Sequence, residues 1–502
     1  VGDASSPSGT NARALGTNAS ATADSALSLG ALSDATGAGA IAIGGDGPDT
    51  GSQGALASNL GAIAIGQDSV SSDLQSVALG ASSESSGAQS VAIGAEALAS
   101  ANQAIAVGDA SQSTGFQSVA IGEGANASAS SAIAVGDGAV ASAAETISIG
   151  DNSDASQANA LAIGRQSISS GVDAVAIGPF AQSTGTAAVG IGADSQATGA
   201  GSIAIGRDSG DAGAIGASAT ATGAIALGQD SVASLDDAIA LGTSAAAQSF
   251  NAVAIGGQAN ASGANSVALG AVAVATNPAS VAIGVASEAT GTRAFAGGNR
   301  AQASGTNSIA IGTDSDDGVG ASATAADAIA LGTDTLASGG RATVIGSDSV
   351  ASGAFATALG FSADATAIDA IAIGTNSRAT EADSVAIGNN AEGLAPGAVG
   401  IGRQAQALGR DSDATAQGAI AIGADGSDTG GSGAQATSLG AIALGEDTLA
   451  SGTQTIAIGS TASALANAAI AIGDDAVASA GLSVAIGNSA DALGVDSVAI
   501  GS

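Results

Sequence analysis

Five short acidic segments are the places where this sequence gathers side chains that could do local chemistry. Each holds two or more aspartates within four residues, with Gly or Ser among them. Carboxylates on a flexible loop could bind Ca²⁺, a hard cation that takes six to eight oxygen ligands. The candidate ligands are Asp46, Asp49, Asp208, Asp211, Asp314, Asp316, Asp317, Asp411, Asp413, Asp425 and Asp428.

Other roles stay open for these segments. Asp, Gly and Ser are also ordinary turn formers, and the segments lack the fixed ligand spacing and closing Glu of an EF-hand loop. Each loop could also reach a neighbouring chain and hold it, with or without an ion. A related group lies two residues after a recurring glycine, where a turn-stabilising role is expected: Asp68, Asp194, Asp230, Asp334 and Asp348.

Composition argues against most other chemistry. The chain has no His and no Cys, and its 44 acidic residues outweigh nine basic ones to give a net charge of −35. No nucleophile–base pair can be assembled, so an enzyme is not expected. A surface this acidic repels nucleic acid. No apolar run reaches the roughly 20 residues of a membrane-spanning helix, and any export signal or anchor is expected to lie outside this sequence.

The elements that must position the acidic segments follow from a series of 34 glycines, which runs from Gly2 to Gly501. Of its 33 steps, 28 are 14 residues long, and the other five are 22, 22, 20, 21 and 22. A fixed period along a whole chain predicts a repeat architecture. We therefore expect one continuous array over residues 1–502, with loop insertions near 45–53, 207–215, 313–319, 403–413 and 424–433.

Each 14-residue unit alternates twice between large and small side chains. Before the glycine stand two large apolar residues with a small one between them, as in Val77-Ala78-Leu79. Small residues lie three and five positions after the glycine, and the residue between them varies. Alternation with period two predicts two short strands in each coil of a parallel β-solenoid. We expect the Val and Ile side chains to meet the small Ala and Ser side chains of the other strand inside the coil. The Ala column of the first strand would then face outward as a seam against identical chains. Arg13 takes a normally apolar position and has no explanation at this level.

The variable position between the two small residues is expected to face solvent. Several apolar side chains recur there and could make lateral contacts between molecules or with an apolar surface. They are Val70, Leu98, Val140, Ile168, Val232, Leu336, Val350, Leu449 and Val477.

The recurring phrase Ser-Val-Ala-Ile-Gly, as at Ser90 to Gly94, with its 14-residue period resembles the head repeat of trimeric autotransporter adhesins, the YadA-like head. The resemblance covers nearly the whole chain. It implies an all-β, left-handed parallel β-roll of 14-residue coils, assembled as a homotrimer on the extracellular face of a bacterial cell. Such heads attach to host matrix, to other cells or to surfaces, and no catalytic residues carry over. The stalk and membrane anchor of complete members have no counterpart here.

Three functions fit these observations. The first is a non-enzymatic adhesin head or shaft. The second is a structural filament that polymerises end to end, because the chain begins and stops in the same phase of the repeat without caps. We expect the uncapped ends to reflect a window from a longer array. The third is an ice-binding solenoid, which is least favoured because the outward column mixes Glu, Gln, Val and Asp instead of regular Thr ranks.

Overall fold

The computed structural model describes residues 5–47, 53–210, 215–315, 318–394, 396–402, 413–423 and 433–501. These residues form 66 strands, β1 to β66, and no helix. No helix capable of crossing a membrane therefore occurs in the described ranges. The chain divides into two compact units, residues 1–251 and 252–502.

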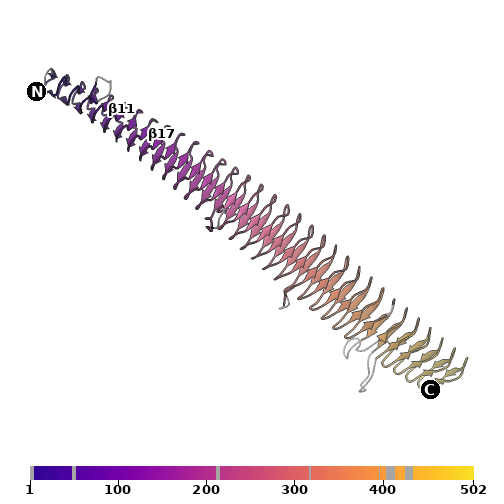
Figure 1. Ribbon diagram of the computed structural model, residues 1–502. Helices are drawn as coiled ribbons and strands as arrows, with labels where there is room; N and C mark the ends of the chain where they lie inside the picture. Colours follow the sequence, from indigo (N-terminus) through magenta and orange to yellow (C-terminus); the bar gives the residue numbers. More distant parts are fainter. Residues whose placement is uncertain are drawn as a thin grey trace. The chain divides into compact units, whose positions relative to one another are not determined.

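The first unit contains β1 (Ser6–Pro7) to β33 (Ala246–Ala247), in which three-residue and two-residue strands alternate along the chain. Each strand pairs in parallel with the strand one coil later. For example, β10 (Val77–Leu79) pairs with β12 (Val91–Ile93), and Ala78 lies opposite Ala92. The two-residue strands β11 (Glu84–Ser85) and β13 (Leu98–Ala99) pair in the same register. Equivalent positions of the repeat therefore stack on one another from coil to coil, and the ribbon shows the strands stacked in this way (Figure 1).

The second unit runs from β34 (Val253–Ile255) to β66 (Val498–Ile500) with the same alternation. Two of its strands are one residue longer, β54 (Val399–Gly402) and β56 (Ile420–Gly423). The interruptions leave the register intact, since Ile309 lies opposite Ile329 across a 20-residue step. The predicted all-β parallel solenoid with 14-residue coils is confirmed.

The prediction of what fills the coil is right for the small residues of the two-residue strands and wrong for the three-residue strands. Ala78, Ala92 and Ala106, from the middle of the three-residue strands, are completely buried, and so are Ala97 and Ala99 from the opposite side of the coil. The Val and Ile residues that flank the Ala column point outward and stay partly exposed, as Ile121 at 40% and Ile149 at 38% show. The interior is thus lined by Ala, Ser and a few Thr, and Val344 is the largest side chain buried completely.

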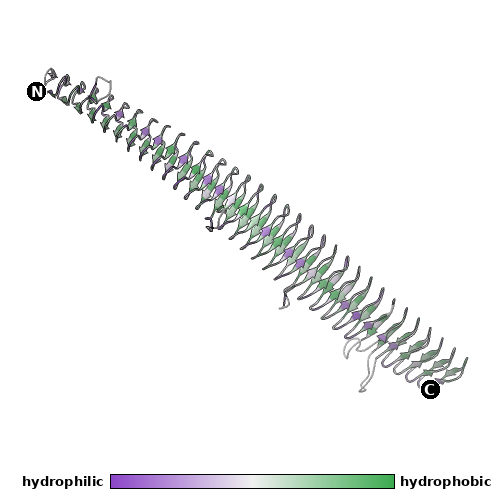
Figure 2. Ribbon diagram, viewed as in Figure 1, coloured by the Kyte–Doolittle hydropathy of each residue, from purple (hydrophilic) through white to green (hydrophobic). Residues whose placement is uncertain are grey.

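The reason lies in the narrow cross-section of the coil. Two strands joined by short turns approach so closely that the space between them suits small side chains, mostly Ala and Ser. The outward Val and Ile side chains form a row along the three-residue strands of each unit, called the aliphatic stripe below. Arg13 is explained by the same geometry, because its position in β2 (Arg13–Leu15) belongs to this outward row and is exposed. Figure 2 shows how the two-residue strands mix polar and apolar residues.

Two residues in most regular coils adopt the left-handed conformation, seven positions apart, as Glu96 (φ 55°) and Gln103 (φ 59°) do. The repeat-marking glycines have a different role. Gly94 has φ +135°, and a Cβ there would lie 2.2 Å from the carbonyl oxygen of Gly108 in the next coil. The glycine period therefore records points where successive coils approach too closely for a side chain.

Candidate functional site: loop roots and outer faces

The three acidic loops whose bases are described leave the solenoid at the same turn of the coil. Asp46, Asp208 and Asp314 each stand two residues after a marker glycine, following β6 (Ile41–Ile43), β28 (Ile203–Ile205) and β42 (Ile309–Ile311). The backbone N–H of each Asp donates to the preceding coil, at 3.1 Å to Ala31 O for Asp46. We call these three aspartates the root aspartates of their loops.

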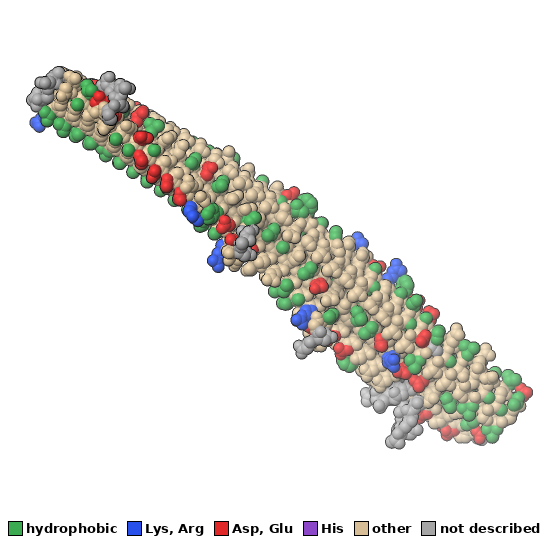
Figure 3. All heavy atoms as spheres, viewed as in Figure 1, with side chains coloured by type: hydrophobic (Ala, Val, Ile, Leu, Met, Phe, Trp, Pro, Cys, Tyr) green, Lys and Arg blue, Asp and Glu red, His purple; other side chains and the backbone are tan. Residues whose placement is uncertain are grey.

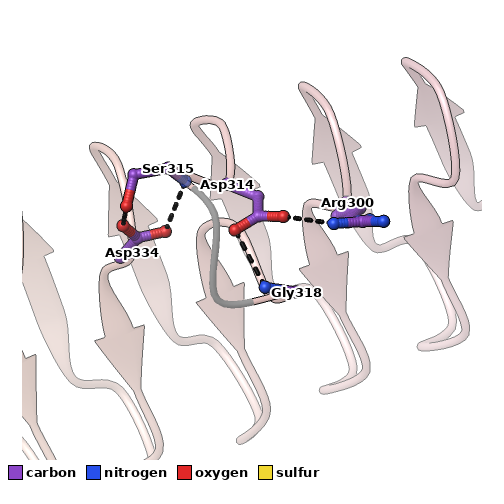
Figure 4. A network of polar contacts seen from close by, with 5 residues as sticks. All are labelled: Arg300, Asp314, Ser315, Gly318 and Asp334. Atoms are coloured by element: carbon purple, nitrogen blue, oxygen red, sulfur yellow. Dashed lines mark hydrogen bonds and ion pairs between the residues drawn. The ribbon is translucent and has the colours of Figure 1, made fainter.

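The third loop shows how its root aspartate is held (Figure 4). One carboxylate oxygen of Asp314 pairs with Nη1 of Arg300 at 2.6 Å, and the other accepts the backbone N–H of Gly318 at 3.0 Å. The Asp314 side chain is only 3% exposed, so its charge needs this compensation. Arg300 lies one coil earlier, at the left-handed position of the same turn (φ 55°).

The first two loops have no such arginine one coil earlier. Leu32 and Asp194 stand where the third loop has Arg300. Asp46 Oδ1 and Asp208 Oδ1 are buried, and no donor in the described part of the chain reaches them. The three roots therefore share a backbone geometry and differ in how the carboxylate is compensated.

The remaining aspartates predicted to bind Ca²⁺ lie either on a strand or in segments that the structure does not describe. Asp413 begins β55 (Asp413–Ala414), on the outward face of a two-residue strand. Seven others lie outside the described residues: Asp49, Asp211, Asp316, Asp317, Asp411, Asp425 and Asp428. Within the described ranges, no three acidic side chains gather closely enough to hold a metal ion. Calcium binding by the loops stays a prediction.

The aspartates expected in turns are found there. Asp68, Asp194, Asp230, Asp334 and Asp348 have φ between 52° and 57°, a conformation that Asp tolerates better than most residues. Three of them also accept hydrogen bonds from the loop that precedes their coil, a contact that the sequence reasoning missed.

The nine residues predicted for lateral contact all lie on two-residue strands, at the outward position, and are partly exposed. Most are separated by polar neighbours, as Val140 and Ile168 are by Asp154. Leu336 and Val350 are adjacent, and together with Val319 and Asp334 they line a hollow of about 280 Å³ beside the third loop. Whether these residues contact other molecules stays a prediction.

A second hollow, of about 570 Å³, lies beside the outward positions of two-residue strands in the first unit. Its lining includes Asp154, Ile168 and Phe180, and the guanidinium of Arg165 stands 4.6 Å from the centre of the Phe180 ring. Burial raises the pKa of the Asp154 carboxyl above its ordinary value. Sequence reasoning missed this hollow, and the available signal was an aromatic residue in a chain with only six Phe.

The largest surface feature that the sequence reasoning assigned wrongly is the aliphatic stripe. It recurs with the three-residue strands of both units, with Ile205 38% exposed in the first and Ile311 44% in the second. Hydrophobic side chains form a visible row along the lower edge of the N-terminal part of the first unit in Figure 3. Acidic side chains are scattered over the same view.

Comparison with known families gives a match that covers most of the chain. The matching family model is described as the YadA head domain repeat (2 copies). No curated protein matches this chain. The matched residues are 8–33, 57–83, 85–111, 113–139, 128–153, 141–167, 155–181, 169–189, 183–209, 219–245, 247–273, 275–301, 298–315, 337–363, 365–391, 401–425, 450–476 and 478–502.

Proposed function

The chain belongs to the YadA head repeat family, and from this premise we propose that it is the head or shaft of a trimeric, non-enzymatic adhesin on the outer surface of a bacterium. In this role it attaches the cell to other cells, to matrix or to surfaces. We expect the ligand to bind at the outward face of the two-residue strands and at the loops, because the sequence there varies from coil to coil.

The aliphatic stripe supports assembly from identical chains. An extended exposed apolar row marks an interface, and its partner needs an apolar face that recurs with the same 14-residue spacing. A second copy of this chain offers such a face. Burial of the stripe would remove Val and Ile side chains from water and add the stabilisation that an interior of Ala and Ser provides only weakly.

Light scattering on the purified chain tests the assembly. We expect a mass of three times the 45.5 kDa of one chain. The double variant Ile121→Asp, Ile149→Asp places charges in the stripe and should shift the mass toward the monomer. The control is Ile168→Asp. Ile168 lies on a two-residue strand, outside the stripe, and its 37% exposure is close to the 38% of Ile149.

Two outcomes would overturn this assembly. One is a wild-type chain that is a monodisperse monomer or dimer. The other is an Ile168→Asp variant that dissociates as readily as the stripe variant. Circular dichroism of each variant shows whether the solenoid still folds.

Adhesion itself is measured by displaying the chain on bacteria that lack other adhesins. We expect more cells to remain on matrix-coated or bare polystyrene after washing than for cells without the chain. Equal retention on every surface would contradict the adhesin role. Negative-stain microscopy separates it from the filament alternative, which requires indefinite fibres in place of particles of uniform length.

A further inference from the structure

The three loops whose bases the structure describes share one contact with the coil that follows them. In each, the backbone N–H of the residue after the root aspartate donates to a carboxylate of the next coil. Gly47 N lies 3.1 Å from Asp68 Oδ1, Ser209 N lies 3.1 Å from Asp230 Oδ1, and Ser315 N lies 3.2 Å from Asp334 Oδ1. Ser315 also donates its hydroxyl to Asp334 (Figure 4). The contact recurs although the sequences of the loops differ.

The same loops are attached on their other side to the preceding coil. In the first loop, the closing residue Gly54 donates its N–H to Leu32 O at 3.0 Å, and a Cβ on Gly54 would lie 2.6 Å from Ala31 O. Gly216 and Gly320 close the next two loops in the same way, bonded to the carbonyl oxygens of Asp194 and Arg300. The base of each of these loops is therefore held by backbone carbonyl groups of the preceding coil and by a carboxylate of the following coil.

The sequence has an Asp at the equivalent position after the other two interruptions as well. All five irregular steps are followed by a coil with Asp two residues after its marker glycine, namely Asp68, Asp230, Asp334, Asp425 and Asp447. Of the 24 coils that neither contain nor follow an interruption, only three have Asp there: Asp194, Asp348 and Asp475. A turn preference alone would distribute Asp evenly among coils, because nearly every coil makes this turn.

We infer that the aspartate after each interruption is a positioning residue that fixes the base of the inserted loop against the solenoid. Asp suits this role because it tolerates the left-handed conformation of the turn, and its short carboxylate reaches a backbone N–H of the adjacent coil. A charged acceptor also forms a stronger hydrogen bond than a neutral one. On the proposed adhesin function, a fixed loop base lowers the entropy lost when a ligand binds there.

The second loop offers the sharpest test, because Arg207 stands at its root and trypsin cleaves after Arg. In the full-length chain, Asp230→Ala removes the acceptor of Ser209, and Ala is accommodated at this turn in other coils, as at Ala110 (φ 51°). We expect roughly tenfold faster amide exchange at Ser209, as for the loss of a charge-assisted hydrogen bond. Cleavage after Arg207 should also accelerate, with no change after Arg165 or Arg378.

Two matched variants separate positioning from a general role in the fold. Asp230→Asn keeps an oxygen acceptor and the turn preference, so most of the protection should return. Asp348→Ala removes an aspartate from the same turn of a coil that follows no interruption, and should leave exchange at Ser209 unchanged. The inference is overturned if Asp230→Ala folds with wild-type exchange and cleavage, or if Asp348→Ala loosens the second loop equally. The mass of the assembly is measured in parallel, so failure of the trimer is seen separately from failure of the positioning residue.

Discussion

The hydroxyl oxygens of Ser85 and Ser90 lie 2.6 Å apart inside one coil, and Ser90 also donates its proton to the carbonyl oxygen of Gly87 at 2.6 Å. Because Ser90 has a single proton, Ser85 must be the donor to Ser90. Ser113 and Ser118 repeat the arrangement with Gly115. The neighbouring coil has Ala99 and Ala104 at the two positions, both fully buried.

This donor order predicts unequal effects of two similar substitutions. Ser90→Ala removes the hydroxyl acceptor of the buried Ser85, which must turn to a backbone carbonyl, as Ser169 does toward Ala174 O at 2.9 Å. It should cost about 1–2 kcal/mol, whereas Ser85→Ala leaves every remaining donor satisfied and should cost about 1 kcal/mol or less. The double variant should be no worse than Ser85→Ala, since the Ala99 coil shows that two methyl groups fit. Native-state hydrogen exchange of this coil measures all three, and equal costs for the single variants would contradict the assigned donor.

Two glycines in one turn should respond very differently to substitution. Gly122 has φ +135°, and a Cβ there would lie 2.2 Å from Gly136 O, whereas Gly124 has φ +62° and open space around it. We expect Gly122→Ala to disrupt stacking of the adjacent coils and lower the melting temperature by several degrees. Gly124→Asn should change it little, because Asn152 already takes this position with φ 50°. A similar loss in both variants would show that chain flexibility matters here, and not the close approach of the coils.

Asp154 should make stability depend on pH in a defined direction. Burial raises the pKa of its carboxyl in the folded chain, so the charged form is disfavoured by folding. Its destabilising effect is fully present above the folded pKa and disappears as pH falls below the unfolded value, ordinarily about 3.9. Asp154→Asn should therefore melt higher than wild type at pH 7, and the difference should shrink as pH is lowered toward 3. A difference that does not vary with pH would mean that the charge of Asp154 is not its cause.

Calcium binding by the loops predicts a melting temperature that rises with millimolar CaCl₂ and falls again with chelator. The first two loops should contribute most, because Asp46 and Asp208 each keep a buried oxygen without a described donor. Asp314 should contribute least, since Arg300 already neutralises it. The comparison is between Asp208→Asn and Asp314→Asn at both calcium levels. If neither addition nor removal of Ca²⁺ shifts the wild-type melt, the aspartates are turn formers and loop anchors only.

Much of the architecture is determined by short-range pattern. The period of the glycines sets the coil length, alternation sets the strands, and identical spacing sets the register in which Val77 lies opposite Val91. The position of the loops follows from the five irregular steps, and the turn role of Asp68 follows from its place after Gly66. Each of these depends on residues within one coil or on repetition of that coil, so a single sequence contains the information.

Only the tertiary structure decided which face of the strand is inside. Alternation separates Ala78 from Val77 and Leu79 without saying which side is buried, and both assignments satisfy the pattern equally. The close approach of the two strands across the coil favours the small side chains of Ala and Ser, so the Val and Ile side chains of the aliphatic stripe are turned outward. The contact between Ser209 and Asp230 was likewise hidden, because residues 21 positions apart meet only when the base of an inserted loop lies beside the following coil.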